Sequence, residues 1–189
     1  MMRGKKLFMV IACVIFLFAS MAAYADTQNA VYTNPRFSIS INCPKNWRVA
    51  LEDNILEGRY GPEGVLVKFR KRSGPYSPYL SLSLIPAFKM LREDWKAQEM
   101  MEQYLQGIQE KYAGKFNLVE PAQETIVDDM PAVQAIYDVV MGPGIEFRER
   151  VIYLRKNEFF IELIASAPRE VFINYDPDFS YAINSLKLE

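Results

Sequence analysis

The sequence contains no histidine among its 189 residues. Without imidazole the chain has no Ser-His-Asp or Cys-His system for nucleophilic catalysis. It also has no zinc, copper or haem site that needs a histidine ligand. The glycine-rich loops that bind nucleotide phosphates and the Ser-x-x-Lys nucleophile pattern are missing as well. We therefore expect a protein that is not an enzyme and that carries no cofactor and no metal ion.

The chain also lacks an excess of either charge, because 22 Lys and Arg residues stand against 23 Asp and Glu residues. A domain devoted to nucleic acid is normally strongly basic, so we expect no nucleic-acid partner. Half of the residues are hydrophobic and 13% are aromatic, which is enough to build a packed core. The length is typical of one domain.

Long hydrophobic runs are absent except for Leu7–Ala19 near the N-terminus. Three basic residues precede this run, and the small-residue sequence Ala23-Tyr24-Ala25 follows it, as in a secretory signal peptide. The run is shorter than the roughly 20 residues of a transmembrane helix. We predict that residues 1–25 are a signal peptide cleaved after Ala25. The mature protein would then be periplasmic or secreted, with no integral membrane segment.

Two other outcomes for this segment stay open. Val10-Ile11-Ala12-Cys13 loosely resembles the processing site of a bacterial lipoprotein, which would give a lipid-anchored protein. Retention of the uncleaved segment would instead tether the chain to the membrane. Against lipidation, processing before Cys13 would leave a hydrophobic stretch at the start of the mature chain, and the hydrophobic region before Cys13 would be unusually short.

Cysteine is scarce, with Cys13 and Cys43 as the two in the chain. Cleavage after Ala25 leaves Cys43 alone, which rules out a disulfide within the mature chain. Because Cys43 ends a stretch of alternating hydrophobic residues, we expect a buried thiol with a packing role. Cleavage also leaves 19 basic and 23 acidic residues, so the mature chain carries a net charge of −4.

The residues after the signal peptide indicate one domain, residues 35–189, which follows a flexible tether at residues 26–34. Alternating hydrophobic and polar residues predict half-buried strands in its first part. Glycine and proline at residues 61–64 predict the turn of a hairpin. The predicted strands of this part are Phe37–Ile41, Ile55–Tyr60, Val65–Lys71 and Leu80–Leu84.

The next segment has hydrophobic residues at the spacing of a helix. Met101, Leu105 and Ile108 share one face of a helix predicted between Leu91 and Tyr112. Later strands with short connections predict an antiparallel meander. They are Glu124–Val127, Ala132–Met141, Ile145–Arg155 and Phe159–Ser166. The C-terminal part predicts a packed helix that begins near Asp176 and Asp178. The fold class is therefore α+β, with a central antiparallel sheet of about six to seven strands flanked by helices.

The order of these elements resembles the PsbP-like family, which includes an extrinsic protein of photosystem II and bacterial exported proteins of the DcrB type. The resemblance extends from about Val31 to the end of the chain. It implies an α/β/α sandwich and a role in binding or assembly, without a shared catalytic motif. The matching sequences are Asn34-Pro35-Arg36-Phe37-Ser38-Ile39, Cys43-Pro44-Lys45-Asn46-Trp47, Asp128-Asp129-Met130-Pro131-Ala132, Ala135-Ile136-Tyr137 and Phe179-Ser180-Tyr181-Ala182-Ile183-Asn184-Ser185-Leu186.

A basic stretch that contains Lys68 and runs into a loop with two tyrosines is the candidate contact surface. Its proposed partner-binding residues are Arg70, Lys71, Arg72, Tyr76 and Tyr79. On an acidic chain these side chains suit an acidic partner or anionic lipid head groups. The structural interpretation is a solvated hairpin whose charges protect a sheet edge from aggregation.

Other conspicuous residues favour structural roles. Trp47 with Pro44 suggests an aromatic anchor for the first strand more than a ligand-stacking ring. Pro131 is interpreted as a structural residue of the Asp128–Pro131 turn. The acidic pairs do not have the ligand spacing of a calcium loop.

The leading hypothesis is a monomeric, exported, non-enzymatic protein that binds an unidentified protein partner at the bacterial cell envelope. The alternative is a small-ligand or metal-binding protein, with hydrolysis as one option, that uses carboxylates and tyrosines in a cleft. A pocket of converging carboxylates with shifted pKa values would favour the alternative. A flat face or basic loop with exposed tyrosines would favour the first.

Overall fold

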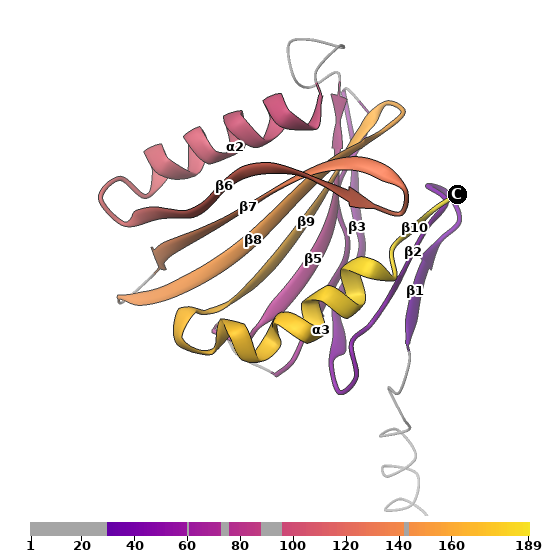
Figure 1. Cartoon of the computed structure of the whole chain (residues 1–189). Helices are drawn as coiled ribbons and strands as arrows, with labels where there is room; N and C mark the ends of the chain where they lie inside the picture. Colours follow the sequence, from indigo (N-terminus) through magenta and orange to yellow (C-terminus); the bar gives the residue numbers. More distant parts are fainter. Residues whose placement is uncertain (1–29, 60, 73–75, 88–95, 142–143) are drawn as a thin grey trace, which may run out of the picture.

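The computed structural model describes residues 30–59, 61–72, 76–87, 96–141 and 144–189. Its middle layer is a seven-stranded antiparallel sheet with the strand order β3-β4-β5-β9-β8-β7-β6 (Figure 1). The strands are β3 (Arg48–Gly58), β4 (Gly61–Arg70), β5 (Tyr79–Pro86), β6 (Phe116–Val127), β7 (Met130–Met141), β8 (Ile145–Lys156) and β9 (Phe159–Pro168). A smaller sheet contains β1 (Val31–Asn34), β2 (Ile39–Asn42) and β10 (Lys187–Leu188).

Helices α2 (Ala97–Lys111) and α3 (Phe172–Asn184) lie on opposite faces of the large sheet (Figure 1). Successive side chains of a strand point to opposite faces, and β8 shows the consequence. The ring of Tyr153 packs against Tyr104 of α2, with centroids 5.5 Å apart. Arg150 instead pairs with Asp176 of α3 at 2.6 Å. The short 3-10 helix η2 (Arg169–Val171) leads from β9 into α3. The predicted α+β class with helices on a central antiparallel sheet is confirmed.

Hydrophobic clusters fill both sides of the sheet. On the α3 side, the small sheet, α3 and β4, β5 and β9 share one cluster, in which Trp47, Phe69 and Phe179 are at most 1% exposed. On the other side, Met101 of α2 is fully buried in a second cluster. Cys43 is buried in the first cluster, and burial raises its thiol pKa to about 11. The expected packing role of this cysteine is confirmed.

The hairpin of β3 and β4 is confirmed, but its turn was placed wrongly. Gly61–Gly64, predicted as the turn, lie inside β4, and the chain reverses between the paired residues Gly58 and Gly61. Gly61 and Gly64 have φ values of 115° and 135°, which other residues rarely adopt. These glycines let the strand continue where turn residues predicted an end.

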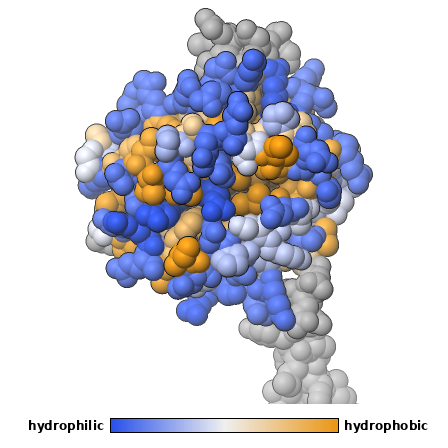
Figure 2. Space-filling model, in the orientation of Figure 1, coloured by the Kyte–Doolittle hydropathy of each residue, from blue (hydrophilic) through white to orange (hydrophobic). Residues whose placement is uncertain are grey.

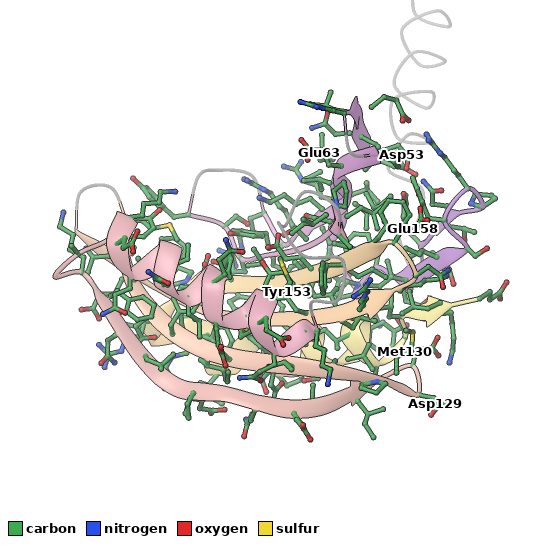
Figure 3. All side chains as sticks on the ribbon, turned by 90° about the horizontal axis from the view of Figure 1, so that it is seen from above. Asp53, Glu63, Asp129, Met130, Tyr153 and Glu158 are labelled. Carbon is green, nitrogen blue, oxygen red and sulfur yellow. The ribbon has the colours of Figure 1, made fainter. Side chains whose placement is uncertain are left out.

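Two later turns follow the prediction. Asp128 and Asp129 both have positive φ, 48° and 61°, as in the tight two-residue turns that join antiparallel strands. Figure 3 shows Asp129 and Met130 at the tip of this β6–β7 hairpin. Pro131 already belongs to β7, where it pairs with Ile126. Asn157, with φ of 54°, turns the chain from β8 into β9.

Four boundaries differ clearly from the prediction. The strand predicted at Ile55–Tyr60 is β3, which begins at Arg48 and whose residues are mostly exposed. Val31–Asn34, assigned to the tether, form β1 and pair with β2, because the buried Tyr32 ties this segment to the core. The strand predicted at Glu124–Val127 begins at Phe116. Its earlier part was not predicted because most of its residues are exposed and show little alternation. The last helix begins at Phe172, so Asp176 and Asp178 lie within it around Pro177.

Some predicted features lie outside the described residues. These are the signal peptide, the cleavage site at Ala25, the tether before residue 30 and the helix residues before 96. No helix of the described part is both long and apolar enough to cross a membrane. Figure 2 shows a largely hydrophilic surface on the face in view, interrupted by separate hydrophobic groups.

Candidate functional site

A row of polar side chains crosses the sheet on its α2 face. Cross-strand pairing joins Tyr137 of β7 to Glu149 of β8, and Glu149 to Ser166 of β9. The row continues from Ser166 to Tyr79 of β5 and from Tyr79 to Arg70 of β4. Directly paired residues share one face and lie side by side. The strand register therefore assembles residues that are up to 96 positions apart in the chain.

Glu149 is the centre of this row and is 4% exposed. Tyr79 donates its hydroxyl hydrogen to Oε1 of Glu149 at 3.1 Å, and Tyr137 donates to Oε2. The hydroxyl oxygens of Tyr137 and Tyr104 of α2 lie 2.8 Å apart. Two tyrosines thus satisfy a carboxyl group that would be costly to bury without partners.

The tyrosines of this network act as donors because their phenols hold their protons. Burial raises the pKa of Tyr79, Tyr104 and Tyr137 far above the ordinary value, and the nearby Glu149 raises all three further. An ionised phenolate would be needed for a tyrosine base or nucleophile. The arrangement favours hydrogen bonding over proton abstraction.

At the β4 end of the row, basic side chains surround one aromatic ring. Nζ of Lys68 lies 3.7 Å from the ring centroid of Tyr79, and Cζ of Arg70 lies 5.9 Å from it. Burial lowers the pKa of Lys68, and the charge of Arg70 lowers it further while Glu149 opposes the shift. Lys68, Arg70 and Tyr79 are each partly exposed, and we call them the basic-tyrosine strip.

The structure divides the predicted contact surface, because Lys71 lies on the other side of the sheet from Arg70 and Tyr79. Arg70 and Tyr79 lie together in the strip. Lys71 turns to the α3 side, where its Nζ lies 3.5 Å from Asp178. The backbone N–H of Arg72 donates to Ser77 at 2.9 Å. Tyr76, 41% exposed, packs near Phe147 with ring centroids 6.2 Å apart.

A second feature on the same face is a cleft of about 460 Å³ between α2 and the sheet. Tyr153 of β8, which Figure 3 shows beside α2, donates a hydrogen bond to Oε1 of Glu162 of β9. Burial raises the pKa of Glu162, the hydrogen bond from Tyr153 lowers it, and Glu149 raises it. The lining residues are Ile85, Met100, Gln103, Tyr104, Gly107, Ile108, Lys111, Tyr153 and Glu162.

Sequence reasoning missed Glu149, Tyr137, Tyr153 and Glu162, although it placed all four in the meander. These four residues could have been found as polar residues at strand positions where the alternating pattern predicts a buried side chain. Finding the cleft also needed the position of α2 relative to the sheet. The cleft contains one carboxylate, so it differs from the converging carboxylates of the alternative hypothesis. Within the described ranges, no three Asp, Glu or Cys side chains are grouped as a metal site requires.

The residues with predicted structural roles lie elsewhere. Pro44 and Trp47 are buried on the α3 side. The indole Nε1 donates to Asp178 of α3 at 2.7 Å, and its ring meets Phe179 edge-on. These contacts fit an anchor. Pro131 lines a separate cavity of about 940 Å³ between the start of α2 and the β6–β7 hairpin.

Comparison with solved structures identifies this architecture. The solution structure of cyanobacterial PsbP (CyanoP) from Synechocystis matches with a TM-score of 0.61, 16% identity, 88% of this chain and 95% of that chain. The fold is PsbP-like. This agrees with the resemblance that the sequence motifs indicated.

Two further structures share the PsbP-like fold. LpqN, involved in cell envelope biogenesis of Mycobacterium tuberculosis, matches with a TM-score of 0.51, 13% identity, 87% of this chain and 86% of that chain. A Pseudomonas aeruginosa protein of unknown function matches with a TM-score of 0.55, 13% identity, 85% of this chain and 97% of that chain. No protein-family model and no curated protein sequence matches the chain. At these identities the likeness shows the fold alone.

Proposed function

We propose that this PsbP-like protein is exported and acts as a non-enzymatic binding or assembly accessory protein at the bacterial cell envelope. The observation that carries the proposal is the basic-tyrosine strip. Lys68, Arg70 and Tyr79 form a partly exposed cationic and aromatic surface on a mature chain whose net charge is −4. Tyrosine and arginine are enriched where proteins bind one another. The partner is an envelope protein with an acidic contact surface.

The chemistry beside the strip supports binding over catalysis. The phenols of Tyr79 and Tyr137 hold their protons and donate hydrogen bonds to Glu149, so the buried network holds the partly exposed Tyr79 of the strip in a fixed position. Export rests on the signal-peptide pattern of residues 1–25. The cell-envelope role of LpqN, whose fold is similar, agrees with this compartment.

The test is crosslinking of the mature protein in intact bacterial envelopes, followed by quantification of the crosslinked partner. Lys68→Ser with Arg70→Ser should reduce recovery of that partner about tenfold or more, since charge-assisted contacts each contribute roughly 1.5–3 kcal/mol. Lys45→Ser, an exposed lysine outside the strip, is the matched control and should leave recovery unchanged. Arg70→Ser alone repeats the test should the double variant unfold.

Equal recovery by the folded strip variants and the parent chain would overturn the strip as the contact surface. Loss of recovery in the Lys45→Ser control as well would show that overall charge, and not the strip, controls capture.

A further inference from the structure

The cleft between α2 and the sheet contains an acid whose hydrogen-bonding capacity is half used. Oε1 of Glu162 accepts a hydrogen bond from Tyr153, and among the described residues no donor or basic side chain bonds Oε2. A carboxylate has about four acceptor positions over its two oxygens. A partly buried carboxylate without a cationic partner is unfavourable, so a ligand that supplies a charged donor gains from the contact.

The aromatic walls beside Glu162 favour the same kind of ligand. The rings of Tyr104 and Tyr153 meet at 64° with centroids 5.5 Å apart, which forms an aromatic corner in the lining of the cleft. Tyr153 is 1% exposed, so the half-buried Tyr104 provides the accessible ring of this corner. Ring faces attract cations. Ile85, Met100 and Ile108 add hydrophobic lining that suits an apolar body.

The size and charge of the cleft narrow the class of ligand. A volume of about 460 Å³ lies within the range of small-molecule sites. The negative charge of an ionised Glu162 disfavours the binding of an anionic ligand. Lys111 is the basic residue of the lining, and its side chain is exposed. Its Nζ lies 5.0 Å from the ring of Tyr112, which does not line the cleft.

We propose that this cleft binds a small organic amine, with its ammonium group on Glu162 and the aromatic corner and its apolar body along Ile85, Met100 and Ile108. The site is separate from the basic-tyrosine strip. Glu162 and Ser166 are four residues apart on β9, so their Cα atoms lie about 13 Å apart along the strand. Tyr104 lines the cleft and its hydroxyl contacts Tyr137 of the polar row, but none of the three residues of the strip lines the cleft. Failure of either proposal leaves the other standing.

The test uses three probes of the same shape: 3-phenylpropylamine, 3-phenylpropanol and 3-phenylpropanoate. Binding to the folded protein is measured by ligand-observed NMR and calorimetry at about pH 8, because burial raises the pKa of Glu162 and the carboxylate form is needed. The amine should bind at least about tenfold more tightly than the alcohol, and the propanoate should bind most weakly. Equal affinity for amine and alcohol, or preference for the propanoate, would overturn the proposal.

Two substitutions locate the binding. Glu162→Gln keeps the side-chain shape and should reduce affinity for the amine to that for the alcohol. Gly107→Leu places a side chain in the lining of the cleft, where a Cβ meets no atom within 4 Å, and should abolish binding of amine and alcohol alike. Gln109→Leu, an exposed position of α2 outside the lining, is the matched control.

Unchanged amine affinity in Gly107→Leu would show that the amine binds elsewhere and would overturn the proposal. Vesicles of phosphatidylethanolamine and vesicles of phosphatidylcholine test whether the bound amine is a lipid head group. Binding to the first vesicles without binding to the free amine would also contradict a small-molecule site.

Discussion

At the scale of single residues, the ionisation of Glu162 makes the unfolding free energy depend on pH. Burial raises its pKa above the ordinary value of 4.5, so the folded chain binds this proton more tightly than the unfolded chain. The contribution of Glu162 to stability is therefore greatest below about pH 4.5 and decreases as pH rises through its folded pKa.

Replacing Glu162 with Gln should remove this dependence. The variant should match the parent chain in acid and become more stable than it as pH rises from about 4 to about 8, because the amide still accepts from Tyr153 without a buried charge. Urea unfolding of both proteins across this range measures the difference. A difference that stays constant with pH would show that Glu162 does not carry the effect.

Gly64 illustrates a backbone constraint at the same scale. Its φ is 135°, and a Cβ at this position would lie 2.3 Å from the backbone oxygen of Asn54 in β3. Gly64→Ala should destabilise the protein by roughly 1–3 kcal/mol, measured by urea unfolding. At Gly107 an added Cβ meets no atom within 4 Å, so Gly107→Ala should instead stabilise α2 by up to about 1 kcal/mol. Equal effects of the two substitutions would contradict the strained β3–β4 pairing.

At the scale of elements, Trp47 links the segment between β2 and β3 to α3. It is 1% exposed, and its indole N–H bonds Asp178 while its ring packs edge-on against Phe179. Trp47→Ala should cost about 3–5 kcal/mol in unfolding free energy. Trp47→Phe should cost less, because it keeps much of the packing and loses the hydrogen bond. A cost for Trp47→Ala below about 1 kcal/mol would contradict the anchor.

The elements also show how far the sequence could predict the fold. Alternation in β5 was clear because Leu80, Leu82 and Leu84 alternate with Ser81 and Ser83, and Asp128-Asp129 marked a turn correctly. The first part of β6 was not found, since most of its residues are exposed and little alternation remains. Gly61 and Gly64 resembled turn residues because positive φ serves both turns and irregular strands.

The candidate site was less predictable for a physical reason. Arg70 and Tyr79 could be named from their chemistry, but the strand register that pairs them could not. Lys71 and Arg72 follow the end of β4, where strand alternation no longer applies, and Lys71 approaches Asp178 of α3. Glu149 and Glu162 become a network and a cleft only through strand register and the placement of α2. A one-residue shift of register would move them to the other face.

At the scale of the whole molecule, both faces of the large sheet pack a hydrophobic cluster, and the polar features gather on one of them. The α3 face holds a hydrophobic cluster shared with the small sheet, which supplies stability without a disulfide. The α2 face carries the polar row, the basic-tyrosine strip and the cleft. Both proposed binding sites therefore lie on the α2 face, beside its hydrophobic cluster.

The proposed route to the envelope gives a prediction at this scale. Cleavage after Ala25 should leave Asp26 as the first residue of the mature chain, because the small residues Ala23 and Ala25 match a signal-peptidase site. Mass spectrometry of the protein purified from envelopes measures this end. A lipidated N-terminal Cys13, or an intact Met1, would contradict cleavage at Ala25.

The basic-tyrosine strip is proposed to bind an envelope protein, and the yield of the crosslinked partner from intact envelopes tests this proposal without an intermediate step. Lys68→Ser with Arg70→Ser should reduce that yield about tenfold or more while the melting temperature and the Lys45→Ser control stay unchanged. An undiminished yield from the folded strip variant would contradict the claim.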